Sequence, residues 1–156
     1  MKKKLLIAAS PGGHLQEILN LTSLFDRYEI VFVTFYTPAL EKFGIKNNVY
    51  FVKDASRGLI NLLRNTISSL LIINGEKPDL VLSTGAGVAL PSLIFSRIFG
   101  IPVIYFELKC QVSRLTKTGR FIRFFANYFF VQDRGLSKKY GVEYASSLDN
   151  LIAVDA

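Results

Sequence analysis

The fold of this chain can be read outward from the stretch KLLIAASPGGHLQEILNL, residues 4–21. A short apolar run over residues 4–9 is typical of a buried strand, and the glycine pair after it makes a tight turn. Apolar residues then recur with helical spacing, which predicts a helix over residues 13–24. A strand, a glycine turn and a helix in this order begin a βαβ unit, in which the strands lie parallel.

The same alternation continues along the chain. We expect five more strands, over residues 29–34, 49–52, 80–83, 102–106 and 128–132. Helices are expected over residues 37–43, 57–73, 87–99, 118–126 and 136–140. Because crossovers between parallel strands are right-handed, this order predicts one α/β domain over residues 1–156, a Rossmann-like doubly wound parallel sheet with helices on both faces. The tail after Tyr144 is either a last strand or a segment that completes another subunit.

The composition points to an anionic partner. The formal net charge is +7, and the mean hydropathy of +0.32 is high enough that some apolar surface should face lipid or another subunit. A nucleic acid, an anionic membrane or a phosphorylated substrate would each match the charge, but no motif supports the nucleic acid. No apolar run reaches the ~18–20 residues of a membrane span, so we expect the chain to touch a membrane without crossing it.

Two glycine-rich loops are the candidate ligand-binding segments. In a doubly wound sheet, ligands bind beyond the carboxyl ends of the strands where the strand order reverses, and there the loops after the first and fourth strands meet. In this chain those loops are SPGGH, residues 10–14, and STGAG, residues 83–87. Glycine allows close approach of the backbone, and helix starts offer free N–H groups. The candidate cleft residues are Ser10, Gly12, Gly13, Thr84, Gly85 and Gly87. Alternatively, each glycine pair only makes a tight turn.

His14 and Glu107 are the candidate catalytic residues. His14 is the single histidine, and a helix N-terminus disfavours the charged ring, so a neutral imidazole there could accept a proton or bind a hydroxyl. Glu107 begins the loop after the strand at 102–106 and should lie beside the glycine loops. The alternatives are that His14 only caps its helix and that Glu107 pairs with a nearby Lys or Arg.

The segment 109–123 has five basic residues and no acidic one. They are Lys109, Arg114, Lys117, Arg120 and Arg123. Such a segment is either a solvated surface or a contact for lipid headgroups or a pyrophosphate. In the expected helix 57–73, apolar residues spread further round than one packing face requires. This helix is therefore either simply buried or lies on a membrane, with Arg57 and Arg64 at its polar edge.

Other site classes have little support. The segment GAGVAL, residues 85–90, resembles a dinucleotide fingerprint, which leaves an NAD-dependent enzyme as an alternative, but Leu90 stands at its third glycine. The sequence has no Asp-x-Asp, phosphate-loop or nucleophile-elbow motif and no His/Cys cluster, and its single cysteine excludes an internal disulfide. We therefore expect no metal and no cofactor.

Four motifs together resemble the Alg14-like family, which includes bacterial capsule and exopolysaccharide proteins of the CpsF, EpsE and PssD type. The motifs are Ser10-x-Gly12-Gly13-His14, Pro78-Asp79 leading to STGAG at 83–87, Tyr105-x-Glu107 followed by Thr118-Gly119-Arg120, and Val131-Gln132 followed by YASSL at 144–148. The resemblance covers nearly the whole chain. It implies half of a GT-B glycosyltransferase fold, similar to the N-terminal acceptor domain of MurG-like enzymes.

The resemblance also implies a partner and a reaction. A separate Alg13-like subunit would hold the nucleotide sugar, and this chain would recruit it to the membrane. The pair would transfer a hexose from a UDP-sugar to an undecaprenyl-pyrophosphate-linked acceptor in surface polysaccharide assembly, peripherally on the cytoplasmic face. His14 and Glu107 would sit at the acceptor side of the cleft. Gln111 replaces the arginine usual in relatives, and Leu108 replaces a small polar residue, so a non-catalytic scaffold that anchors and activates the Alg13-like partner is the alternative.

Overall fold

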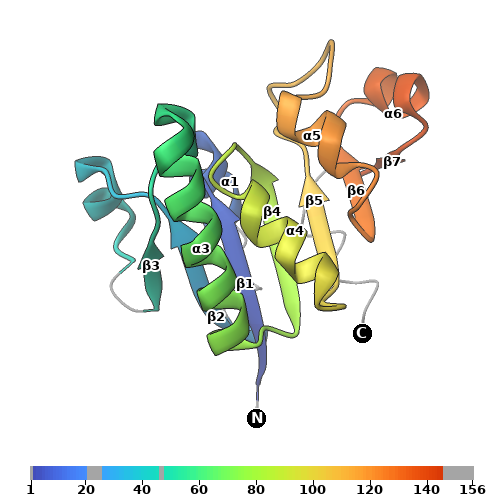
Figure 1. Ribbon diagram of the computed structural model, residues 1–156. Coiled ribbons are helices and arrows are strands. Elements are labelled where there is room, and N and C mark those ends of the chain that lie inside the picture. The colour runs from blue at the N-terminus through green and yellow to red at the C-terminus, as the bar shows by residue number, and fades with distance from the viewer. Residues whose placement is uncertain (1, 21–25, 46–47, 146–156) are drawn as a thin grey trace.

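The computed structural model describes residues 2–20, 26–45 and 48–145 (Figure 1). The strands are β1 (Lys3–Ala9), β2 (Tyr28–Thr34), β3 (Val49–Phe51), β4 (Leu80–Gly85), β5 (Val103–Phe106), β6 (Tyr128–Val131) and β7 (Glu143–Tyr144). The α-helices are α1 (Gly13–Leu19), α3 (Leu59–Glu76), α4 (Leu90–Ile98), α5 (Lys117–Ile122) and α6 (Arg134–Tyr140). Two 3-10 helices, η1 (Pro38–Phe43) and η2 (Ala55–Arg57), flank β3.

The strands form one parallel sheet in the order β3-β2-β1-β4-β5-β6-β7. Leu5 at the centre of β1 is in register with Ile30 of β2 on one side and Leu80 of β4 on the other. The order reverses between β1 and β4, which confirms the predicted doubly wound sheet and places the two glycine loops side by side. β7 is a seventh strand, and the rest of the tail, with most of the YASSL motif, lies outside the described residues.

Several boundaries differ from those predicted. α4 begins at Leu90 and not at Gly87, because Ala86 adopts a positive φ of 73° and the chain turns before Pro91 can enter the first helical turn. α3 runs on to Glu76, where Lys77 ends it in the left-handed conformation. α1 is described as far as Leu19, and the rest of the predicted helix falls largely in residues 21–25, outside the described part.

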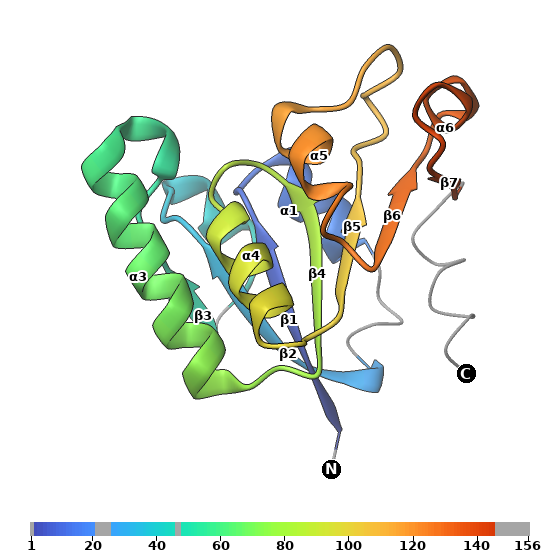
Figure 2. The same cartoon turned by 45° about the vertical axis from the view of Figure 1, so that its right-hand side comes forward.

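Each face of the sheet carries its own core, because alternate residues of a strand point to opposite faces. On β1, Leu6 and Ala8 pack under α3, α4 and α5, whereas Leu5 and Ile7 pack on the side of α1. The two views in Figures 1 and 2 show α3, α4 and α5 covering one face and α1 lying behind the sheet. Helices therefore cover both faces, as predicted.

α3 packs on α4 through polar side chains. Asn65 Nδ2 donates to the carbonyl of Val88 at 3.0 Å, Ser69 Oγ donates to Asn65 Oδ1 at 2.9 Å, and Ser92 Oγ bonds Ser69 Oγ at 3.1 Å. Asn65, Ser69 and Ser92 are fully buried. Each of these three buried side chains thus has a hydrogen-bond partner, and the small serines let the two helices approach closely.

The apolar side of α3 consequently faces outward. Leu59, Ile60, Leu63, Ile67 and Leu71 are 55–71% exposed, and we call these five residues the α3 stripe. The alternative of a simply buried helix is therefore wrong. Within the described ranges, no helix combines the length and apolar character needed to span a membrane.

Candidate functional site

The two glycine loops are joined by a reciprocal pair of hydrogen bonds between His14 and Thr84. The His14 ring nitrogen Nδ1 lies 2.9 Å from the carbonyl oxygen of Thr84, and Thr84 Oγ1 donates to the carbonyl oxygen of His14, also at 2.9 Å. His14 opens α1 and Thr84 stands near the end of β4. The predicted meeting of the two loops is thus held by both side chains and both main chains.

The bond to Thr84 selects the protonation pattern of His14. A carbonyl oxygen can only accept, so Nδ1 carries the hydrogen and Nε2 carries the lone pair of the neutral ring. Burial lowers the pKa of His14 below its ordinary 6.5, and this outweighs the opposite effect of the Thr84 carbonyl. His14 is therefore neutral near pH 7, with Nε2 free to accept a proton, and burial is the main cause.

The glycines of these loops serve different purposes. At Gly85 (φ 112°), a Cβ would lie 2.4 Å from the hydroxyl oxygen of Tyr105 and 3.5 Å from His14 Cε1, so a side chain is excluded. Gly12 has open space around it but a φ of 100° that favours glycine. Gly13 and Gly87 have open space and no positive φ. Packing and conformation therefore do not require glycine at 13 and 87, which leaves close approach of a ligand as their predicted purpose.

Glu107 lies in a closed pocket and not on the open cleft. Its side chain is fully buried, and Oε2 accepts hydrogen bonds from the amide and the hydroxyl of Thr116, both at 3.2 Å. Thr116 also caps α5, because its Oγ1 accepts from the amide of Gly119 at 2.9 Å. The alternative that Glu107 pairs with a Lys or Arg is wrong, since no such ion pair forms among residues 2–20, 26–45 and 48–145.

Burial raises the pKa of Glu107 to about 7, and the bonds from Thr116 and the backbone of Leu108 offset only part of this effect. The carboxyl is thus divided between its protonated and ionised forms near neutral pH. Gly119 closes the pocket: a Cβ there would lie 2.1 Å from Glu107 Oε2. Loop 108–116 and α5 must move before Glu107 can meet a substrate, and its catalytic role stays a prediction.

Tyr105 connects the two candidate residues, which do not contact each other. Its hydroxyl lies against Gly85 and 3.2 Å from Thr116 Oγ1, the group that also bonds Glu107. Its ring stacks on Phe129 at 5.0 Å, and burial raises its pKa, so the phenol stays neutral. The motif Tyr105-x-Glu107 contained this residue, but its part in the site was missed, because β5 buries it as though it were an ordinary core aromatic.

Gln132 is a second residue whose part the sequence left unassigned. It follows β6, and its side-chain amide donates to the carbonyl oxygen of Glu107 at 3.2 Å and to the carboxylate of Glu17 on α1. Gln132 thus holds the start of the loop after β5 against α1. The motif Val131-Gln132 was the signal that could have found it.

The basic segment divides into two parts. Lys109, Arg114, Lys117 and Arg120 are exposed, and the last three line a cavity of about 320 Å³ together with Gln111. Arg123 is half-buried instead, and its guanidinium lies 4.4 Å from the ring centroid of Phe124 and 5.4 Å from that of Tyr140. Arg123 therefore holds α5 against its neighbours, while the other four remain predicted contacts for an anion.

Relatives identify the family. The family described as "Oligosaccharide biosynthesis protein Alg14 like" matches residues 52–148. The Homo sapiens protein "UDP-N-acetylglucosamine transferase subunit ALG14" is 33% identical over 168 aligned positions, which cover 87% of this chain and 78% of the human protein. The Mus musculus protein of the same name is 36% identical, and the match covers 88% of this chain and 78% of the mouse protein.

A longer enzyme is also similar. The UDP-N-acetylglucosamine–N-acetylmuramyl-(pentapeptide) pyrophosphoryl-undecaprenol N-acetylglucosamine transferase of Synechococcus sp. (strain JA-3-3Ab) is 35% identical over 136 positions, or 79% of this chain. The match covers only 37% of that enzyme. This chain therefore corresponds to little more than one third of a single-chain transferase.

Solved structures share the fold. Acinetobacter baumannii MurG superposes with a TM-score of 0.70 at 19% identity, over 86% of this chain and 43% of that one. UDP-N-acetylglucosamine 2-epimerase from Rickettsia bellii gives a TM-score of 0.75 at 12% identity, and the match covers 94% of this chain and 45% of the epimerase. The chain thus has the Rossmann-like architecture of one half of these larger proteins.

Proposed function

The chain belongs to the Alg14 family, and on that premise we propose that it is the acceptor-side subunit of a two-component glycosyltransferase. The reaction would move a hexose, with an N-acetylhexosamine as the first candidate, from a UDP-sugar to an undecaprenyl-pyrophosphate-linked sugar. The names of the human and Synechococcus relatives supply the donor class, and that of the Synechococcus enzyme the acceptor class. Assembly of a capsule or exopolysaccharide is the proposed setting.

The observation that carries this proposal is the neutral His14 held by Thr84 at the carboxyl edge of the sheet, with Nε2 free. An acceptor hydroxyl seated on the open glycines 13 and 87 would donate its proton to Nε2. Its oxygen would then form a bond to the anomeric carbon of the donor, while the bond from that carbon to the nucleoside diphosphate breaks and the electron pair leaves with the phosphate. His14 is the proposed general base, and an Alg13-like partner would hold the nucleotide.

The names of the relatives support a partner. The human and mouse relatives are each called a transferase subunit, which implies that a second subunit completes the enzyme. The carboxyl edge that holds His14 would be one wall of the active site, and the other wall would come from the second subunit.

A peripheral membrane position is supported by the outer surface. Besides the α3 stripe, Ile98 and Phe99 at the end of α4 and Phe121 on α5 are large, apolar and exposed. All three helices cover the same face of the sheet (Figure 2). Exposed apolar side chains on three helices of one face, in a chain of net charge +7, suit the anionic inner face of a cell membrane.

The scaffold alternative is favoured by one observation, the closed pocket around Glu107, which leaves this chain with a single accessible candidate base. A sugar-transfer assay separates the two functions. Membranes with lipid-linked acceptor would receive a panel of UDP-sugars with this chain alone, the Alg13-like partner alone, or both. Transfer only with both supports the split enzyme, whereas equal transfer by the partner alone reduces this chain to an anchor.

A further inference from the structure

A second basic pocket lies at the same edge of the sheet, on the other side of the glycine loops from segment 109–123. Its volume is about 340 Å³, and its walls come from the residues after β2, the residues after β3 and the first two turns of α3. Since β2 is the neighbour of β1 in the sheet, the residues of this pocket that follow β2 lie next to the His14 loop, which follows β1. The sequence motifs gave no signal for it.

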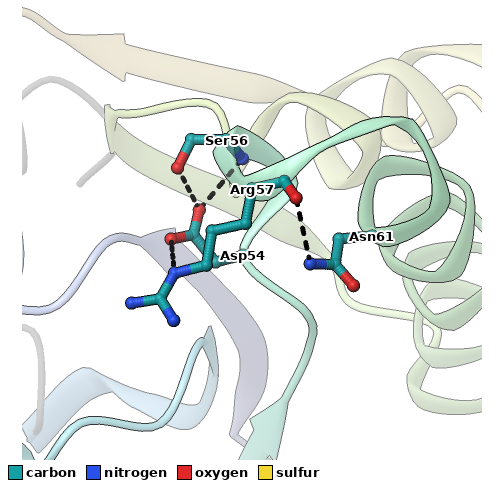
Figure 3. Close-up of polar contacts among 4 residues, drawn as sticks. All are labelled: Asp54, Ser56, Arg57 and Asn61. Carbon is teal, nitrogen blue, oxygen red and sulfur yellow. Dashed lines mark hydrogen bonds and ion pairs between the residues drawn. The ribbon is translucent and has the colours of Figure 1, made fainter.

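The pocket carries an excess of positive charge. Lys53, Arg57 and Arg64 line it, and Asp54 is the acid among its lining residues. Asp54 is already occupied: Oδ1 accepts from the amide of Ser56 at 3.0 Å and from its hydroxyl at 2.6 Å, and Oδ2 accepts from Arg57 Nε at 3.2 Å (Figure 3). Burial alone would raise the pKa of Asp54, but the hydrogen bonds from Ser56 and the charge of Arg57 together outweigh it. The pKa is therefore lowered, and Asp54 is ionised. Three cations and one carboxylate leave the lining with two positive charges in excess.

Arg57 is positioned for a further anion. Only its Nε faces Asp54, and Figure 3 shows its two terminal nitrogens pointing away from that carboxylate. The side chain is 75% exposed although the pair fixes its direction. Asn61 and Arg64 are at positions i and i+3 of α3, so they share the face of that helix that lines the pocket, and Arg57 reaches the pocket from η2. Two guanidinium groups that line one pocket, one of them with its terminal nitrogens turned away from its carboxylate partner, are suited to phosphate oxygens.

The α3 stripe begins beside this pocket. Leu59 and Ile60 open α3 just after the η2 residue Arg57 and its cap Gly58, and Leu63 precedes Arg64, so the apolar track begins at the edge of the charged pocket. Tyr36 and Phe51, which are in edge-to-face contact at 5.7 Å, line the pocket and are themselves more than half exposed. Phosphate-binding cations next to a track of exposed aliphatic side chains match a molecule that has both a phosphate group and a long hydrocarbon chain.

We propose that this pocket binds the diphosphate of the lipid-linked acceptor, and that its prenyl chain leaves along the α3 stripe into the membrane. The proposal rests on the proposed function and names the subsite for the anchor of its acceptor. The diphosphate sits at the ends of β2 and β3, and the attached sugar extends over β1 toward His14. Segment 109–123 then faces other anions, among them membrane headgroups.

Vesicle binding tests the proposal without donor or partner. The purified chain is titrated with phosphatidylcholine vesicles that contain either undecaprenyl diphosphate or phosphatidylglycerol at equal surface charge. Lys53→Gln and Arg64→Gln should each weaken binding to the diphosphate vesicles about tenfold, as for the loss of one hydrogen bond between charged groups, and binding to phosphatidylglycerol less than about threefold. Arg64→Lys should retain most of the preference. Lys138→Gln, on the exposed side of α6, is the matched control and should change neither.

Three results would overturn the proposal: equal loss on both vesicle types, no loss on either, or a diphosphate-specific loss only in Arg114→Gln and Arg120→Gln, which places the group in the other basic cavity. Thermal unfolding of each variant shows whether a loss of binding reflects a loss of folding. Selective binding without sugar transfer would reject the proposed function and retain the pocket. Transfer without selective binding would reject the pocket alone.

Discussion

His14 Nδ1 donates a hydrogen bond of 2.9 Å to the carbonyl oxygen of Thr84, and this bond leaves Nε2 as the accepting nitrogen of the site. The first prediction follows from it. In the reconstituted pair, His14→Asn should lower kcat by about 10²–10⁴-fold, the usual contribution of a general base, with little change in KM. The asparagine amide can still donate to Thr84, so the melting temperature should stay near that of the parent. Transfer rates at saturating acceptor measure the effect.

His14→Phe is the companion variant, because it removes both the base and the bond to Thr84. It should lose transfer as His14→Asn does and also melt at a lower temperature. Full activity in both variants would show that His14 is not the base and would favour the scaffold function.

The pH dependence of transfer gives a second prediction. The general base must be neutral, and burial holds the pKa of His14 below 6.5. The rate should therefore stay level as the pH falls from 8 to 6.5 and decline only at lower pH. The free energy of unfolding should also decrease as the pH falls through 6.5, because the unfolded chain takes up a proton on His14 before the folded chain does. A pH–rate profile whose acid limb begins above pH 7 contradicts this assignment.

Glu107 gives a third prediction: its contribution to stability decreases as the pH rises, whereas that of His14 increases. Its pKa is raised to about 7 in the folded chain from an ordinary 4.5, so the folded state binds the extra proton between these values. Its contribution to the free energy of unfolding is complete below pH 4.5 and is lost as the pH rises through 7, with a total of about 3 kcal/mol. Glu107→Gln keeps an acceptor for Thr116 but cannot ionise.

Denaturant unfolding of the parent and of Glu107→Gln at several values between pH 5 and pH 8 isolates this effect. The difference between the two proteins removes the contribution of His14, which both retain. Relative to the parent, the variant should become more stable as the pH rises. A constant difference would mean that the carboxyl titrates outside this range.

Much of the fold was predictable from local pattern. The strand at residues 4–9 and the glycine turn after it form by short-range rules, and the reversal between β1 and β4 follows from the order of parallel units. The meeting of the two loops that carry His14 and Thr84 could therefore be predicted. The closed pocket of Glu107 was not, because it depends on where Thr116 and Gly119 return after a loop that has no periodic pattern. The sequence did not decide whether the α3 stripe faces inward or outward. That depends on which face of α3 carries Asn65 and Ser69 against α4.

The α3 stripe supplies a fourth prediction. Leu63→Gln and Ile67→Gln should weaken binding to anionic vesicles several-fold, because each removes exposed apolar area that would enter the lipid interface. Neither should lower the melting temperature, since glutamine is a good helix former and both positions face outward. Leu93→Ala, at a fully buried position of α4, should do the reverse and cost about 2–5 kcal/mol of stability. If the stripe packs on a protein partner instead, the vesicle affinity of the glutamine variants will match that of the parent.

The last prediction concerns Gly119, whose missing side chain makes room for Glu107. Because a Cβ there would lie 2.1 Å from Oε2 of that carboxylate, Gly119→Ala should cost about 1–3 kcal/mol, although alanine normally favours a helix. Gly87→Ala is the matched control: it meets open space, so it should leave the melting temperature unchanged. A Glu107→Ala background removes the contact at 2.1 Å and leaves Thr116 Oγ1 at 3.0 Å, so Gly119→Ala should then cost less. An equal cost in both backgrounds would mean that Gly119 is needed for some reason other than the buried carboxyl, and the closed pocket would lose its explanation.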